Sequence, residues 1–131
     1  MMTRTELEDT LARYGIRPGL RSSMQTVELL EKILWEPAYG TMMDGYAVVG
    51  RRYGVRPVQV ERNVHARILH VWRTGDDRLL QSLLPWRTRL DPPGNREFLY
   101  ALAAQIRMEY LRRGRDILYE GLENAPTEQC V

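Results

Sequence analysis

The sequence predicts an all-α fold, a compact bundle of about five or six helices. Three observations lead to this class. Apolar residues recur at every third or fourth position in several segments, glycine and proline separate those segments, and no stretch of convincing length alternates between apolar and polar residues. With 131 residues, the chain can bury one hydrophobic core that needs neither disulfides nor a metal.

Two helices are expected before residue 41. The first follows a start signal at Thr3 or Thr5 and ends at the stretch YGIRPG. Its apolar residues, at helical spacing, are Leu7, Leu11 and Tyr14. The second begins at Ser22 or Ser23 and ends at the stretch WEPAYG, and its apolar stripe is formed by Met24, Val27, Leu30, Ile33 and Leu34.

A third and a fourth helix follow with a short connection between them. The third runs from Met42 or Asp44 to Tyr53, and Gly54 ends it. The fourth lies between Pro57, whose missing N–H costs nothing in a first helical turn, and Gly75. Two helices joined in this way have the arrangement of a helix-turn-helix, although such pairs are also common in helical domains of other kinds.

The rest of the chain contains one more long helix. The stretch DRLLQSLLPW can hold one or two helical turns, and RTRLDPPG is expected to be a loop. Asn95 is expected to cap the final helix, whose stripe consists of Phe98, Leu99, Leu102, Ile106 and Tyr110. We expect one domain over residues 1–120 and a disordered acidic tail over residues 121–131, with a core that includes Met42, Met43, Trp35, Trp72 and Trp86.

The fourth helix has one apolar side and two polar flanks. At about 100° per residue, the side that must face the core is formed by Val60, Val64, Ile68 and Val71. One flank carries Glu61, Arg62 and His65 with Gln59 near the back, and the other carries Asn63, Arg67 and His70. The spacing alone does not decide which flank faces a binding partner.

Basic residues are unevenly distributed along the chain. All of the 19 basic residues except Lys32 are arginine, and most of them lie between residues 51 and 115. Arginine makes planar, bidentate contacts with phosphates and guanine edges, whereas codon usage in a GC-rich genome accounts for the same excess without any function. The formal net charge of +2 says little by itself about partners.

Several functional classes find no support. His65 and His70 are five residues apart, the wrong spacing to hold one metal ion on a helix, and no glycine-rich phosphate loop or nucleophile elbow is present. Cys130 has no partner for an internal disulfide. No apolar stretch approaches the roughly 18 residues of a membrane span, and the N-terminus lacks the apolar run of a signal peptide. We therefore expect a soluble, cytoplasmic protein with no enzymatic activity, metal, cofactor, small-molecule substrate or membrane partner.

Four stretches together resemble a known family. VQVERNVHARILHVWRTGD contains the triplet Val60-Glu61-Arg62, and the others are YGIRPGLRSSMQTVELL, YAVVGRRYGV and PPGNREFLYALAAQIRME. In unbroken order over about residues 12–110, they are similar to the C-terminal DNA-binding effector domain of the sporulation master regulator, stage zero sporulation protein A. The resemblance implies a helical domain that binds operator DNA through a helix-turn-helix, often as tandem head-to-tail copies.

The resemblance also assigns the groove-facing flank. Base contacts are implied for Gln59, Glu61, Arg62 and His65, and two of these, Gln59 and His65, stand where the family commonly has arginine. In the family the positions of Asn63 and Arg67 hold small buried residues. Their replacement here implies a slightly rotated helix, or an Arg67 that reaches the surface or pairs with an acidic residue.

Base-edge chemistry gives each side chain a role. Arg62 can donate to guanine O6 and N7, Gln59 can pair with adenine, and Glu61 can accept from a cytosine amine. Arg51, Arg52 and Arg56, which end the third helix and follow it, are expected to contact phosphates unless they are simply solvated surface charges.

These features together predict a sequence-specific DNA-binding transcription regulator that binds double-stranded DNA, with homodimers as a further expectation. The family's receiver domain finds no counterpart in the dozen residues before the match, so we expect constitutive binding or control by another protein. The alternative is a protein-interaction module that keeps the fold and modulates a full-length regulator without binding DNA.

Overall fold

The computed structural model describes residues 2–36 and 40–114, and every regular element in those ranges is a helix. The helices are α1 (Arg4–Arg13), α2 (Arg21–Trp35), α3 (Met42–Tyr53), α4 (Pro57–Thr74), α5 (Asp77–Leu83) and α6 (Asn95–Arg112). The predicted all-α fold is confirmed. The predicted boundary at residue 120 and the tail over 121–131 lie outside the described residues.

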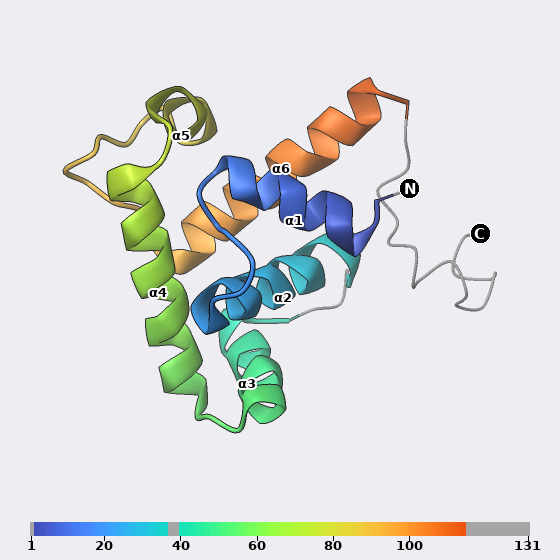
Figure 1. The fold of residues 1–131 in the computed structure, drawn as a ribbon, viewed down its shortest axis with the longest axis vertical. Coiled ribbons are helices and arrows are strands. Elements are labelled where there is room, and N and C mark those ends of the chain that lie inside the picture. The colour runs from blue at the N-terminus through green and yellow to red at the C-terminus, as the bar shows by residue number, and fades with distance from the viewer. Residues whose placement is uncertain (1, 37–39, 115–131) are drawn as a thin grey trace.

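Helix α4 runs along one side of the molecule (Figure 1). Its N-terminal end lies beside α3 and its C-terminal end leads into α5, so the two ends of α4 lie at opposite ends of the molecule. Helices α2 and α6 pack against each other and against α4, while α1 packs on α2. The position of α4 therefore leaves one long side of this helix facing away from the bundle.

The side of α4 that faces the bundle is the one that the sequence predicts. Val60, Val64, Ile68 and Val71 are fully buried, and they belong to the same hydrophobic core as Phe98, Leu99, Leu102 and Ile106 of α6. Burying each such side chain contributes roughly 1.5 to 3 kcal/mol to folding. The orientation of α4 about its own axis is thus fixed by its apolar residues, and the polar flanks take the places that remain.

The connection between α3 and α4 depends on two glycines. Gly54 ends α3 with φ of +67°, a left-handed conformation that costs about 1 kcal/mol for other residues. Gly50 lies in the last turns of α3, where a Cβ would meet the Val55 carbonyl oxygen at 2.6 Å. Because both positions are occupied by glycine, the chain can turn from α3 into α4 within the three residues 54–56.

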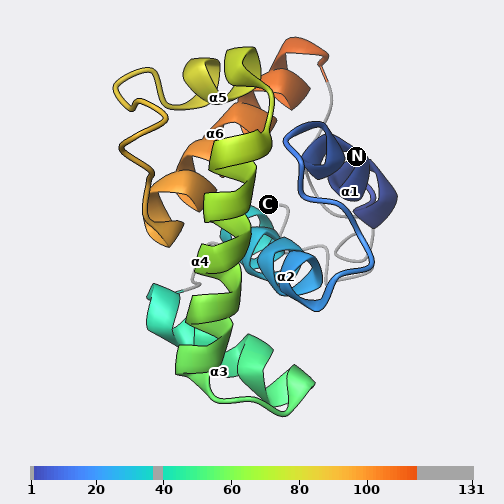
Figure 2. The same ribbon diagram turned by 60° about the vertical axis from the view of Figure 1, so that its left-hand side comes forward.

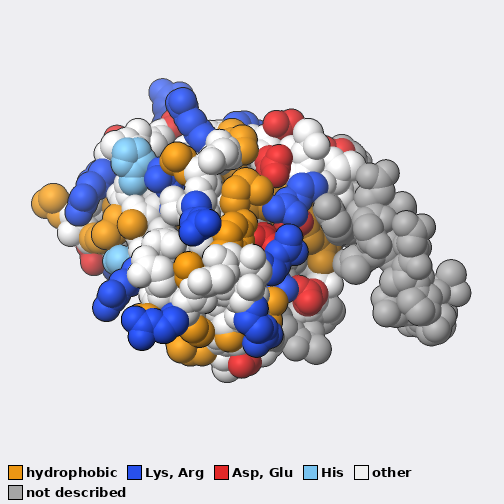
Figure 3. Space-filling model, turned by 60° about the horizontal axis from the view of Figure 1, so that its bottom comes forward, with side chains coloured by type: hydrophobic (Ala, Val, Ile, Leu, Met, Phe, Trp, Pro, Cys, Tyr) orange, Lys and Arg blue, Asp and Glu red, His pale blue; other side chains and the backbone are white. Residues whose placement is uncertain are grey.

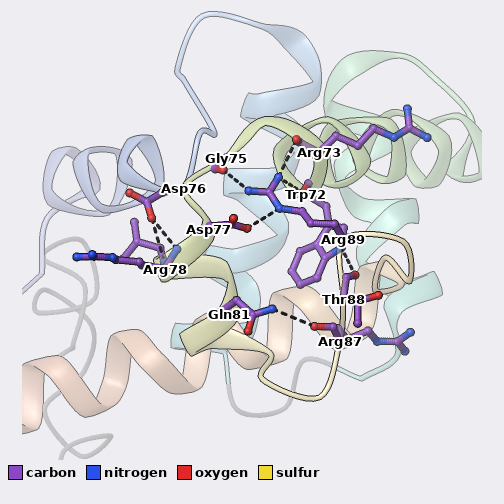
Figure 4. Close-up of polar contacts among 11 residues, drawn as sticks. Trp72, Arg73, Gly75, Asp76, Asp77, Arg78, Gln81, Arg87, Thr88 and Arg89 are labelled. Atoms are coloured by element: carbon purple, nitrogen blue, oxygen red, sulfur yellow. Dashed lines mark hydrogen bonds and ion pairs between the residues drawn. The ribbon is translucent and has the colours of Figure 1, made fainter.

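The C-terminal end of α4 is closed by Arg89 from the loop before α6 (Figure 4). Its guanidinium donates to the carbonyl oxygens of Trp72 (2.8 Å), Arg73 (2.7 Å) and Gly75 (2.9 Å) and pairs with Asp77 at 2.7 Å. The last carbonyls of a helix have no partner within the helix, so a cation there satisfies them and interacts favourably with the helix dipole.

Three expectations about single residues are wrong. Asn95 does not cap α6; Gly94 is the N-cap, and Asn95 is the first helical residue with its side chain buried in the bundle. Trp86 is 66% exposed because it lies on a loop, where its indole donates to Glu97 at 2.8 Å. Met43 is 56% exposed because the first turn of α3 turns it away from the core, whereas Met42, Trp35 and Trp72 are buried as expected.

Candidate nucleic-acid interface

One flank of α4 faces an open groove. Glu61, Arg62 and His65 are exposed on this flank, and the groove beside them has a volume of about 1260 Å³. Its other walls are the beginnings of α3 and α6, which lie next to α4 in Figure 2. Much of the lining is apolar or aromatic and comes from Met42, Met43, Tyr46, Ala66, Leu69 and Tyr100. The predicted reading flank therefore combines charged and polar groups with an apolar floor.

Gln59 does not share this groove. Its side chain is exposed, but its amide nitrogen donates to Asn63 Oδ1 at 2.9 Å. Asn63 in turn donates to Gln25 Oε1 of α2 at 3.1 Å. The structure thus places three of the four predicted base-contacting residues together, and it directs the fourth toward α2.

The opposite flank of α4 is held by α2. Asn63 and Arg67 are both half-buried, and Arg67 Nε donates to Ser22 Oγ at 3.2 Å. Of the alternatives that the sequence leaves open, Arg67 takes a neutral partner rather than an acidic one, and it stays partly in contact with water. Asn63 and Arg67 are thus engaged by α2, whereas His70, farther along the same flank, is exposed. The flank with Glu61, Arg62 and His65 remains accessible.

The three arginines predicted to contact phosphates differ in their surroundings. Arg51 and Arg56 are exposed, and their side chains make no hydrogen bond or ion pair within residues 2–36 and 40–114. Arg52 is 69% exposed, but its Nε lies 2.9 Å from a carboxylate oxygen of Glu28, which is only 7% exposed. In the space-filling view of the α3 end of the molecule, arginine side chains are spread among hydrophobic ones rather than gathered in one patch (Figure 3).

Asn95 joins three helices beneath the groove. Its Nδ2 donates to Tyr46 Oη of α3 at 3.1 Å and to the Glu61 carbonyl oxygen of α4 at 3.1 Å. His65 Nδ1 lies 3.2 Å from its Oδ1. Burial raises the pKa of the Tyr46 hydroxyl above its ordinary value, and the hydrogen bond from Asn95 opposes this rise. Sequence reasoning missed this role because the partners of Asn95 are 30 to 49 residues away.

Comparisons of this chain with known protein families, with curated proteins and with solved structures found no match. The family resemblance stays a prediction that rests on the four stretches quoted above.

Neither a metal-binding cluster nor a membrane-spanning helix is found in the part of the chain that the structure describes. Within residues 2–36 and 40–114, no three side chains of histidine, cysteine, aspartate or glutamate gather where they could hold a metal ion. In the same ranges, no helix has both the length and the apolar character to cross a bilayer.

The open flank of α4 can make directional polar contacts with a partner. Arg62 can donate two parallel hydrogen bonds to a partner, and the carboxylate of Glu61 can accept hydrogen bonds from one. The imidazole of His65 can do either, according to its tautomer. An α-helix that carries such groups fits the major groove of B-DNA, which is about 12 Å wide. The apolar floor of the groove offers a second kind of contact, with apolar side chains of another protein.

Proposed function

We propose that this chain is a sequence-specific DNA-binding regulator of transcription, in which α3 and α4 act as a helix-turn-helix and α4 enters the major groove. One observation carries the proposal: the open flank of α4 presents Glu61, Arg62 and His65 away from the core. Three residues separate this helix from α3, which ends in exposed arginines. We also propose that the regulator acts in the cytoplasm.

The roles follow from the surroundings of each side chain. Arg62 has no partner among the described residues and is the residue we assign to guanine O6 and N7. Arg51 and Arg56 supply phosphate contacts that set the register of α4 in the groove, and the two η-nitrogens of Arg52 join them while its Nε keeps Glu28. Gln59 can contact a base only if its hydrogen bond to Asn63 breaks, so we expect it to contribute least to recognition.

The test is selection of bound sequences from a random pool of DNA duplexes. The wild-type chain should enrich one motif, and Arg62→Ala should lose preference at one base pair of it. Arg73→Ala is the matched control, because Arg73 is an exposed arginine on α4 about 16 Å along the helix axis from Arg62. Arg73→Ala should select the wild-type motif. No enriched motif for the wild-type chain at low salt would reject the proposal.

Tandem binding has its own signature in the same experiment. If two copies bind head to tail, the selected motif should occur twice in the same orientation, about 10 base pairs apart. A single copy of the motif would indicate a monomer on DNA.

A second candidate function rests on the apolar floor of the groove. Met43, Leu69 and Tyr100 offer an adaptable apolar surface of the kind that protein partners use. The alternative is therefore a protein-interaction module that modulates a full-length regulator. Salt separates the two functions, since a DNA binder loses affinity steeply between low and moderate salt, whereas an interaction module binds no duplex at any salt.

A further inference from the structure

The side chain of Asn95 has an orientation that its partners determine. It is 9% exposed and lies at the first position of α6, below the groove. One of its partners is the main-chain carbonyl oxygen of Glu61, at 3.1 Å. A carbonyl oxygen can only accept, so the amide nitrogen of Asn95 must face Glu61. The amide oxygen of Asn95 then faces the ring of His65.

This orientation settles which ring nitrogen of His65 carries the proton. The Asn95 oxygen lies 3.2 Å from His65 Nδ1, and an amide oxygen can only accept. Nδ1 must therefore donate. A neutral imidazole has one N–H, so the other nitrogen, Nε2, has a free lone pair. Because His65 is exposed and lines the groove, this lone pair is available to a partner.

We propose that Asn95 is a positioning residue that makes His65 a hydrogen-bond acceptor in the groove, and that His65 accepts from the exocyclic amine of a nucleobase. In the major groove only cytosine N4 and adenine N6 carry such an amine, whereas guanine and thymine present acceptors there. The inference rests on the proposed function and adds the class of base that one position of α4 reads. It differs from an arginine at the same place, which only donates.

The two neighbours of His65 on this flank, Arg62 and Glu61, have opposite hydrogen-bonding roles. Arg62, three residues earlier on the same flank, can only donate, and Glu61, four residues earlier, can only accept when ionised. With His65 held as an acceptor, the flank presents one donor between two acceptors. This pattern fits a guanine, which accepts two hydrogen bonds from Arg62, beside bases that carry amines.

The first test examines the tautomer without DNA. Nitrogen-15 spectra of the histidine rings of the wild-type chain, recorded at a pH where both rings are neutral, should show His65 with its proton on Nδ1. His70 is the internal control, because it is exposed and its ring has no hydrogen-bond partner among the described residues, so its proton should favour Nε2 as in free histidine. A proton on Nε2 of His65 would overturn the inference whatever the chain does with DNA.

The second test examines the base. Selection with His65→Ala should relax one base pair of the wild-type motif, where the preferred base is cytosine or adenine, by about tenfold. Asn95→Leu should relax the same base pair and keep the guanine read by Arg62. His70→Ala is the matched control, because His70 is exposed and lies on the opposite flank of α4, and it should keep the full motif.

The outcomes separate the two proposals. A motif whose His65-dependent base is guanine or thymine would overturn the inference and leave DNA binding in place. The absence of any motif would reject the proposed function and the base assignment with it, and the tautomer result would stand alone. If Asn95→Leu does not fold, the wild-type spectrum and the His65→Ala motif still decide the matter.

Discussion

The two ends of α4 use arginine in opposite ways. At the C-terminal end, Arg87 and Arg89 are fully engaged by the protein: Arg87 pairs with Glu97 at 2.6 Å and Asp91 at 2.8 Å, and Arg89 holds the last carbonyls of the helix. At the N-terminal end, Arg51 and Arg56 have no such partner among the described residues. The same residue type therefore stabilises the fold at one end and is free to bind at the other.

Helix electrostatics explains why this difference is useful. Carbonyl groups and partial negative charge accumulate at the C-terminus of a helix, so a cation placed there is held by its own protein. The N-terminus carries partial positive charge, which adds to nearby arginines in attracting an anion such as a phosphate. Arg87 and Arg89 thus belong to the fold at the C-terminal end of α4, whereas Arg51 and Arg56 are exposed at its N-terminal end. The overall charge of the chain does not reveal this difference.

The largest effect on stability is expected at the C-terminal end. Arg89→Ala leaves three carbonyl oxygens and Asp77 without their donor and should lower the free energy of unfolding by about 2 kcal/mol. Urea denaturation measures this change, and Arg89→Lys should recover part of it. Affinity of the folded variant for duplex DNA should stay near that of the wild type. A variant as stable as the wild type would show that Arg89 does not close α4.

Arg62→Ala should do the reverse: it should weaken DNA binding and leave stability nearly unchanged. Affinity for the preferred duplex should fall by roughly 1 to 3 kcal/mol, with lost preference at one base pair, as measured by fluorescence anisotropy. The free energy of unfolding should change by less than about 0.5 kcal/mol, because the side chain is exposed and has no partner in the described residues. Equal, small losses on every sequence would mean that Arg62 touches phosphate rather than a base.

Arg51 and Arg52 both lie near the N-terminal end of α4, but within the described part of the chain only Arg52 pairs with a residue of the fold, Glu28. Either change to alanine should weaken binding to all duplexes alike and reduce the dependence on salt by about one ion. Only Arg52→Ala should also destabilise the fold, by about 1 kcal/mol, because it leaves the Glu28 carboxylate buried without its cation. Thermal denaturation of the two variants in parallel separates these effects. Identical stability for the two would contradict the structural role of the Glu28 pair.

Glu31 of α2 lies apart from both ends of α4 and should alter stability alone. Burial raises its pKa to about 6, although Arg4 at 3.1 Å opposes the rise. A carboxyl whose pKa is raised in the folded state binds more protons there than in the unfolded chain, so stability falls as pH rises from about 4.5 to 6. Glu31→Gln should remove up to about 1 kcal/mol of this fall. An unchanged pH profile of unfolding would contradict the assignment.

The bounds of the helices were predictable where the signals are local. Proline at the start of α4 and the left-handed Gly54 after α3 act within one turn, so both helices lie where the sequence places them. The apolar side of α4 was predictable for the same reason. The hydrogen bond between Gln59 and Asn63 follows a spacing of four residues, and that spacing was a usable signal.

The rest of the site depends on contacts between distant segments. Asn95 has the sequence context of a cap, yet it lies one residue inside α6 and reaches Tyr46 and Glu61. The pairing of Arg52 with Glu28 and the closure of α4 by Arg89 likewise join separate helices and loops. No periodicity within one segment encodes which loop returns to which helix end.

Amide chemical-shift mapping during titration with duplex DNA at low salt tests the central claim most directly. The account predicts that saturating duplex shifts the amides of Arg51, Arg56, Glu61, Arg62 and His65, while those from Trp86 to Asp91 stay in place. Shifts confined to the C-terminal end of α4 would contradict it, as would an unchanged spectrum with excess duplex.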